Sequence, residues 1–165
     1  MNTMTRVLSI ITGLACLLAL GAAATAAAAN TTIVTKIANL QFGATIEACD
    51  PFAGITFDLE SPAGTQIGQG TGCITGDVSE CPDGPVPGCH ETVYSTLTFT
   101  LNGRGTLVAP STFQQVDLTN GLPFRSTGAI TSGTGEFVGA AGTVRGQGVI
   151  FFDGTTNATY VVSIR

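Results

Sequence analysis

The chain has 165 residues, a length typical of one domain, and only 10% of them are charged. It contains 22 Gly, one His and no Trp, and its formal net charge is −5. An acidic chain repels phosphate backbones and anionic lipid, so this composition excludes a nucleic-acid-binding protein. It also excludes a multi-span membrane protein, because the long uncharged apolar run is confined to residues 7–29.

Residues 1–29 have the order of a secretory signal peptide. Arg6 supplies the positive charge, an apolar run follows, and residues 27–29 form an Ala-x-Ala cleavage site. The alternative is a transmembrane anchor, which the weakly hydrophobic alanines and the absence of a basic flank disfavour. We therefore expect a signal peptide at 1–29, a mature domain at 30–165 and secretion to the extracellular space or the periplasm. Loss of Arg6 would leave the mature domain with a net charge of −6.

Four cysteines remain in the predicted mature domain: Cys49, Cys73, Cys81 and Cys89. An even number of cysteines in a small secreted domain predicts two disulfides. Cys81 and Cys89 flank a Pro- and Gly-rich loop, and Cys49 and Cys73 border two expected strands. We predict the pairs 49–73 and 81–89 by this proximity, and the pairs 73–81 and 49–89 are the main alternative.

Alternation of apolar and polar residues with period 2 dominates the predicted domain, and no window shows good helical periodicity. In residues 54–60, for example, Ile55, Phe57 and Leu59 share one face. The expected strands are residues 32–42, 54–60, 66–74, 92–101, 105–109, 113–118, 124–130, 144–152 and 158–165. Turn signals separate nearly all of them, and Asn102-Gly103 predicts a type I′ hairpin. The pattern predicts an all-β domain, a barrel or a sandwich of antiparallel strands.

Residues 76–91 interrupt the alternation and are acidic and rich in Pro, so we expect a loop pinned by a disulfide. A metal site here would combine Cys81, Cys89 and His90 with Asp83 or Glu91. The spacing of these residues matches no usual zinc site, and an oxidising compartment favours disulfides. We expect no metal and no cofactor.

Residues 126–148 are rich in Gly, and Gly133, Gly135 and Gly139 nearly match a dinucleotide-binding motif. That interpretation fails because no βαβ unit surrounds the segment and Glu136 would face a phosphate. A tight connection between two strands explains the glycines better.

Residues 129–142 read AITSGTGEFVGAAG and resemble the I-T-G-G-[TA]-G-x-[FY]-x-G-A-x-G signature of the allene oxide cyclase and dirigent barrels. The matching positions are Gly133, Gly135, Phe137, Gly139 and Gly142. Residues 64–73 and 91–107 resemble further strands of that family in the same order. Over residues 40–164 the resemblance implies an eight-stranded antiparallel β-barrel that forms a homotrimer or a homodimer.

The same resemblance implies a lumen that holds an apolar small molecule. Members of the family cyclise an unsaturated fatty-acid epoxide or guide the radical coupling of phenols. Aromatic residues here could line such a lumen, and Phe57, Phe99 and Tyr94 are candidate ligand contacts. Arg125 and Arg145 flank the Gly-rich segment and are candidates for binding an anionic head group, or they pair with surface acids.

The catalytic residues of the family do not carry over. The plant cyclases place a carboxylate on the first strand, but residues 30–43 contain no Asp or Glu, and Thr35 or Lys36 falls near that place. Cys73 matches the family's strand cysteine with an offset of one residue, and we expect it in a disulfide. The catalytic residues therefore stay unassigned.

We expect a secreted, dirigent-like barrel that binds an apolar small molecule without acid–base chemistry of its own. It would bind neither nucleic acid nor, after signal cleavage, a membrane. A cyclase or isomerase that folds an extended unsaturated substrate is one alternative. A secreted structural or interaction scaffold is the other.

Overall fold

The computed structural model describes residues 30–44, 46, 49, 54–80, 88–116, 120–153 and 155–165. The predicted signal peptide at residues 1–29 lies outside the described residues, as does Cys81. Within the described part the chain forms nine strands and a short 3₁₀ turn. They are β1 (Thr31–Ala44), β2 (Gly54–Glu60), β3 (Gln66–Ser79), β4 (His90–Leu101), β5 (Gly105–Val116), β6 (Gly121–Ile130), β7 (Ser132–Gly133), η2 (Gly135–Phe137), β8 (Gly142–Phe151) and β9 (Thr156–Ile164).

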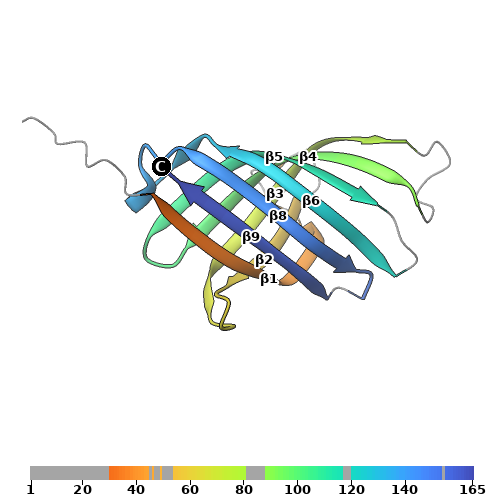
Figure 1. The fold of residues 1–165 in the computed structure, drawn as a ribbon, viewed down its shortest axis with the longest axis horizontal. Coiled ribbons are helices and arrows are strands. Elements are labelled where there is room, and N and C mark those ends of the chain that lie inside the picture. Colours follow the sequence, from red (N-terminus) through yellow and green to blue (C-terminus); the bar gives the residue numbers. More distant parts are fainter. Residues whose placement is uncertain are drawn as a thin grey trace, which may run out of the picture.

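Eight of these strands form a closed antiparallel barrel, drawn in Figure 1. Sequence neighbours pair from β1 to β6, β8 pairs with β6 and β9, and β9 returns to β1. The two-residue strand β7 adds to β5 beside the wall. The expected all-β class and the antiparallel barrel are confirmed. Closure gives each of the eight barrel strands a partner on both sides, which limits a route to aggregation.

Two predictions about strand boundaries are corrected. The ranges 105–109 and 113–118 were expected as separate strands, but β5 runs unbroken from 105 to 116. Pro110 is tolerated because neither β6 nor β7 pairs with it on that side of β5, so its missing N–H removes no ladder bond. The loop expected at 76–91 is shorter, because β3 extends to Ser79 and β4 begins at His90.

The hairpin between β4 and β5 is confirmed, but its predicted type I′ turn is wrong. A type I′ turn needs positive φ at both central residues, and only Gly103, with φ of 70°, has it. The amide of Arg104 donates to the carbonyl of Leu101 at 3.1 Å. Asn102 therefore keeps a negative φ, and the turn has the geometry of type II.

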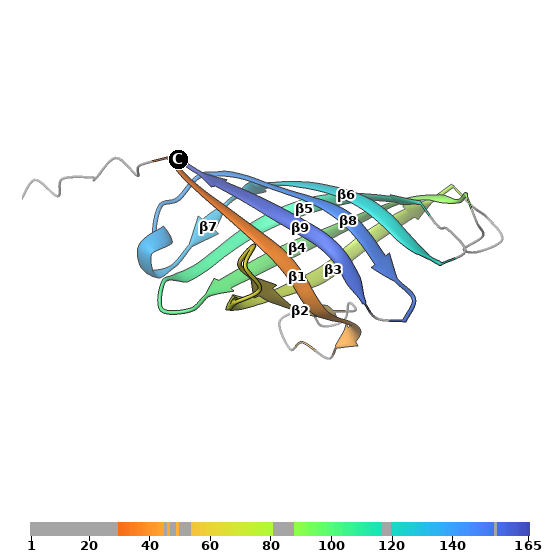
Figure 2. The same ribbon diagram turned by 60° about the horizontal axis from the view of Figure 1, so that its bottom comes forward.

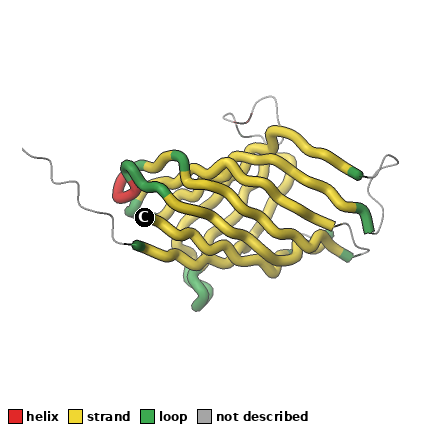
Figure 3. The backbone as a smooth tube through the Cα atoms, turned by 45° about the horizontal axis from the view of Figure 1, so that its top comes forward, coloured by secondary structure: helices red, strands yellow, loops and turns green. Residues whose placement is uncertain are grey.

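The two ends of the barrel differ. At the capped end, where β1, β3, β5 and β8 begin, the Gly-rich segment folds into β7 and η2 and places Phe137 against the core. Figure 3 shows η2 at the same end as the C terminus, and Figure 2 shows β7 beside it. We call the other end, where β2, β4, β6 and β9 begin, the mouth. The tight connection predicted from the glycines thus also serves as a cap.

Aromatic side chains fill the middle of the lumen. The ring centroids of Phe57, Phe99 and Tyr160 lie 5.4 to 6.3 Å apart, and all three side chains are buried. Glycines on neighbouring strands make room for two of these rings. A Cβ at Gly70 would lie 1.9 Å from the Phe57 ring, and one at Gly146 would lie 2.4 Å from the Tyr160 ring. These rings and the glycines beside them therefore fill the middle of the barrel.

Candidate functional site

An apolar cavity of about 110 Å³ lies inside the barrel at the mouth. Phe57, Phe124 and Tyr160 belong to its lining and to the aromatic core, so the packed middle of the lumen forms its inner end. Side chains nearer the strand ends complete the wall. They are Ile37, Leu40, Phe42, Ile55, Ile74, Val93, Ser95, Phe113, Gln115, Leu122 and Ile150.

The rim of this cavity exposes apolar surface. Phe42 pairs with the lumen-facing Ile55 and is 58% exposed. Phe152, which follows the mouth end of β8, is 63% exposed. Aromatic side chains of this size are normally buried, so their exposure at one end marks a surface that can contact an apolar molecule.

Three buried hydroxyls inside the barrel have no hydrogen-bond partner within the described residues: Thr35 Oγ1, Ser95 Oγ and Ser126 Oγ. A buried polar group without a partner is costly, and such groups usually meet a water molecule or a ligand. Of the three side chains, Ser95 lines the cavity. The cavity therefore offers one unpartnered hydroxyl on a wall that is mostly apolar.

Among the described residues that line the cavity, Tyr160 alone has an ionisable side chain. Burial raises the pKa of Tyr160 well above its ordinary value of 10.0. The neighbouring Ser126 hydroxyl acts in the opposite sense and more weakly, without the geometry of a full hydrogen bond. Tyr160 therefore stays neutral across the physiological range and is a poor general base.

This burial predicts an alkaline loss of stability. The folded state keeps the Tyr160 proton above pH 10, whereas the unfolded state releases it, so the free energy of unfolding falls as pH rises beyond that value. Urea unfolding at about pH 9 and about pH 11 should show this decline, and Tyr160→Phe should remove part of it. An identical decline in the wild type and the Tyr160→Phe variant would contradict the prediction.

The structure separates the predicted ligand contacts. Phe57 lines the cavity, and Phe99 packs behind it in the core. Tyr94 is 45% exposed and alternates with the buried Ser95, so it lies on the outer face of the barrel. Tyr94 is therefore not part of the cavity.

Arg125 and Arg145 also lie on the outer face, on β6 and β8. Together with Thr and Gln side chains they line a solvent-open hollow of about 460 Å³. Similar polar hollows of about 360 and 490 Å³ occur elsewhere on the outer wall. Another, of about 430 Å³, lies at the mouth, where His90 and Arg125 belong to its lining and it shares Gln115 and Phe124 with the apolar cavity. These larger volumes are open to solvent and lined largely by polar side chains, so we place the candidate site in the smaller, apolar lumen cavity.

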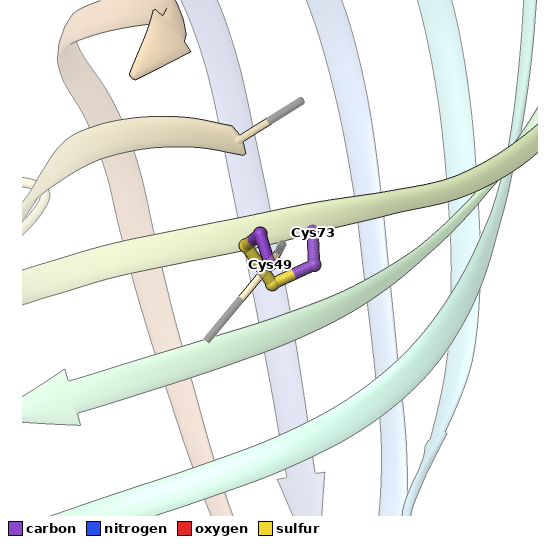
Figure 4. The surroundings of a disulfide bond; sticks show 2 residues. All are labelled: Cys49 and Cys73. Atoms are coloured by element: carbon purple, nitrogen blue, oxygen red, sulfur yellow. A yellow bond between two sulfur atoms is a disulfide. The ribbon is translucent and has the colours of Figure 1, made fainter. Parts of the chain in front are cut away.

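The predicted disulfide between Cys49 and Cys73 is confirmed, with the two Cα atoms 5.0 Å apart (Figure 4). Cys73 follows the lumen-facing Gly72 on β3, so its side chain points to the outer face. The sulfur is therefore neither a free thiol nor part of the lumen. Cys89 is also disulfide-bonded, and the predicted partner Cys81 lies outside the described residues.

Ser95 and Gln115 were missed by reasoning from the sequence. Both occupy inward positions of strands whose inward residues are mostly apolar, and a buried serine looks the same in sequence as an exposed one. Gln115 Nε2 donates a hydrogen bond of 2.7 Å to Glu91 Oε2 across the β4–β5 ladder. The departure from strict alternation on β4 and β5 is the one signal that could have found them.

Thr35 and Lys36, which fall near the family's first-strand carboxylate, face opposite sides of the barrel wall. Thr35 is 1% exposed inside the lumen, and Lys36 is exposed outside. Neither side chain supplies a carboxylate, and neither lines the cavity.

No cluster of three or more His, Cys, Asp or Glu side chains suited to a metal ion occurs among the described residues. None of the helices in the described part of the chain is long and apolar enough to span a membrane.

Comparisons of the chain with protein-family models, with curated proteins and with solved structures find no match. The candidate site therefore rests on the geometry of this barrel: an apolar cavity at the mouth, an aromatic inner end and an unpartnered serine hydroxyl.

Proposed function

We propose that this protein is a secreted barrel that binds an apolar small molecule in the cavity at its mouth. The observation that carries the proposal is the apolar cavity of about 110 Å³ beside the exposed rim residue Phe42. An engineered apolar protein cavity of about 150 Å³ binds benzene, so a cavity of this size suits a ligand with one small ring. A longer ligand would extend past the rim.

Secretion is supported by the signal-like residues 1–29 and by the Cys49–Cys73 disulfide, which forms and persists in oxidising compartments. A relation to the allene oxide cyclase and dirigent barrels is supported by the signature at residues 129–142 and agrees with the eight-stranded barrel. Within that relation we propose a dirigent-like role, in which the site holds a ligand in one pose.

A cyclase with its own acid–base groups has less support. Tyr160 is the ionisable side chain of the described lining, and its raised pKa keeps it neutral. Two carboxylates lie near the cavity by strand register: Asp77 pairs with Val93 but is exposed, and Glu91 is engaged by Gln115 at the rim. Cyclisation here would depend on the shape of the cavity rather than on proton transfer.

The second candidate function is a structural or interaction scaffold. The packed aromatic lumen favours it, because the remaining cavity lies below the roughly 300 Å³ at which drug-sized ligand sites begin. Threonines on the outward positions of β4, such as Thr98 and Thr100, give the outer wall a polar face suited to contact with other molecules.

Ligand-detected NMR with benzene and toluene distinguishes the two functions. The wild type should bind both probes, and Leu122→Trp, which places a bulky side chain in the cavity, should abolish binding. Val161→Trp is the matched control, since Val161 lies between the buried Tyr160 and Val162 and faces outward. Absence of binding by the wild type, or equal binding by Leu122→Trp, would refute the ligand-binding proposal and leave the scaffold.

A further inference from the structure

The chemical class of the ligand can be read from the polar atoms of the cavity. The hydroxyl of Ser95 on β4 belongs to a cavity-lining side chain that is only 4% exposed, and the other polar side chains of the lining are Tyr160 and Gln115. The Ser95 hydroxyl finds no hydrogen-bond partner among the described residues. A serine hydroxyl can both donate and accept a hydrogen bond, so it can bind either an alcohol or a carbonyl oxygen.

Thr35 and Ser126 also carry buried hydroxyls without a partner among the described residues, but neither lines the cavity. Ser111, the neighbour of Ser95 across the ladder, has a partner. Ser95 and Ser111 are directly paired across the β4–β5 ladder and share the lumen face, and Ser111 is 5% exposed. Ser111 Oγ donates to the carbonyl of Ala109 at 3.1 Å, so its hydrogen-bonding need is met within its own strand. Of this pair, only Ser95 lines the cavity, and only its hydroxyl lacks a hydrogen-bond partner in the described part of the chain. This points to a ligand atom at Ser95.

Of the other two polar side chains, Tyr160 lies at the inner end of the cavity beside Ser126, and Gln115 lies nearer the rim. Gln115 is four residues along β5 from the partner of Ser95, a distance of about 13 Å along an extended strand. Val93 and Phe113 pair with each other in between and give the wall an apolar belt. A ligand that reaches Ser95 must therefore present an apolar body to this belt.

The positions of the charged side chains restrict the chemical class of the ligand further. No Lys, Arg or His side chain lines the cavity among the described residues, and Lys36, Arg125 and Arg145 are exposed on the outer face. The strand connections at residues 45–53, 81–87 and 117–119 contain no basic residue either. A carboxylate placed at Ser95 would be buried without a counter-charge, which is strongly unfavourable. The oxygen that meets Ser95 must be uncharged.

We infer that the ligand is an apolar molecule that ends in one uncharged oxygen group, an alcohol, aldehyde or ketone, which enters first and hydrogen-bonds to Ser95 Oγ. This inference rests on the proposed function, since it names the ligand class of the same cavity. A fatty acid would bind only with its carboxylate outside the mouth. Ser95 is thus a specificity residue, and the apolar belt between Ser95 and Gln115 holds the body of the ligand.

Three probes of similar size test this on the purified protein: toluene, benzyl alcohol and benzoate. Dissociation constants are measured by ligand-detected NMR for the wild type, Ser95→Ala and Ser111→Ala. We expect Ser95→Ala to weaken benzyl alcohol about tenfold, the value of one net hydrogen bond, and to leave toluene unchanged. Ser111→Ala should alter neither constant, and benzoate should bind detectably to none of the three proteins.

The outcomes separate this inference from the proposed function. If the wild type binds toluene but Ser95→Ala leaves benzyl alcohol unaffected, the Ser95 hydroxyl is satisfied by water and the inference is overturned. Binding of benzoate as tight as that of benzyl alcohol would overturn it as well. If the wild type binds none of the probes, the proposed function itself fails. Thermal unfolding of both variants confirms folding, and Ser95→Ala should be at least as stable as the wild type because it removes an unpaired buried hydroxyl.

Discussion

Phe137→Ala is expected to lower the free energy of unfolding by about 3 to 5 kcal/mol, the range for removing a buried phenylalanine side chain. Phe137 is 4% exposed and closes the capped end of the barrel. The Arg104 guanidinium lies 5.1 Å from the centroid of its ring, and Arg104 Nε is 2.8 Å from Glu136 Oε2. Removal of the Phe137 side chain would open a cavity in the cap, and backbone contacts hold the cap in place.

The backbone around Phe137 leaves little room for relaxation. A Cβ at Gly133 would lie 2.4 Å from the Phe137 carbonyl oxygen, and Gly135 adopts a φ of 62° close to the backbone of Arg104. A loop packed this closely cannot collapse into the cavity left by Phe137→Ala, so the full cavity penalty applies.

Val138→Ala is the matched control for Phe137→Ala, because the adjacent Val138 is 76% exposed. It should change the stability by no more than about 0.5 kcal/mol. Urea denaturation followed by far-UV circular dichroism measures both variants. Similar small losses in the two variants would show that Phe137 does not seal the barrel.

The double variant Cys49→Ser/Cys73→Ser is expected to lose about 3 kcal/mol, since the disulfide closes a loop with a sequence separation of 24. The bond restricts the unfolded chain and ties the connection between β1 and β2 to the outer face of β3. Against a typical total stability of about 5 to 15 kcal/mol, this loss would lower the melting temperature markedly.

The double variant is preferred to a single one because it leaves no unpaired thiol of its own pair to form a wrong disulfide with the remaining cysteines. Its unfolding should be compared with that of the wild type by urea denaturation without a reductant. A loss below about 1 kcal/mol would mean that the unfolded chain is already restricted at this loop.

Much of the wall of the barrel was predictable from local patterns. The alternation of Ile55, Phe57 and Leu59 places them on one face of β2, and all three are buried. The hairpin at Asn102-Gly103 and the pair Cys49–Cys73 followed from turn chemistry and proximity in the chain. The extent of β5 through Pro110 was not predictable, because it depends on where β6 and β7 leave that strand unpaired.

The candidate site was harder to predict from the sequence than the wall of the barrel. The sequence pointed to Phe57, which lines the cavity, and also to Tyr94, Arg125 and Arg145, which lie on the outer face. Aromatic and basic residues are attractive as ligand contacts in a sequence, but their side of a strand depends on register. The hydroxyl of Ser95 gained significance only when its surroundings were seen to lack a partner.

The sequence by itself determined the all-β class, most strand positions and one disulfide, because period-2 alternation, turn residues and cysteine spacing are properties of short segments. The tertiary structure decided that the sheet closes, through pairing of β1 with β9 that brings Thr31 opposite Ile164. It also decided that the Gly-rich segment caps one end with Phe137 and that a cavity remains at the other. These features depend on contacts between residues far apart in the chain, and such contacts leave no local pattern.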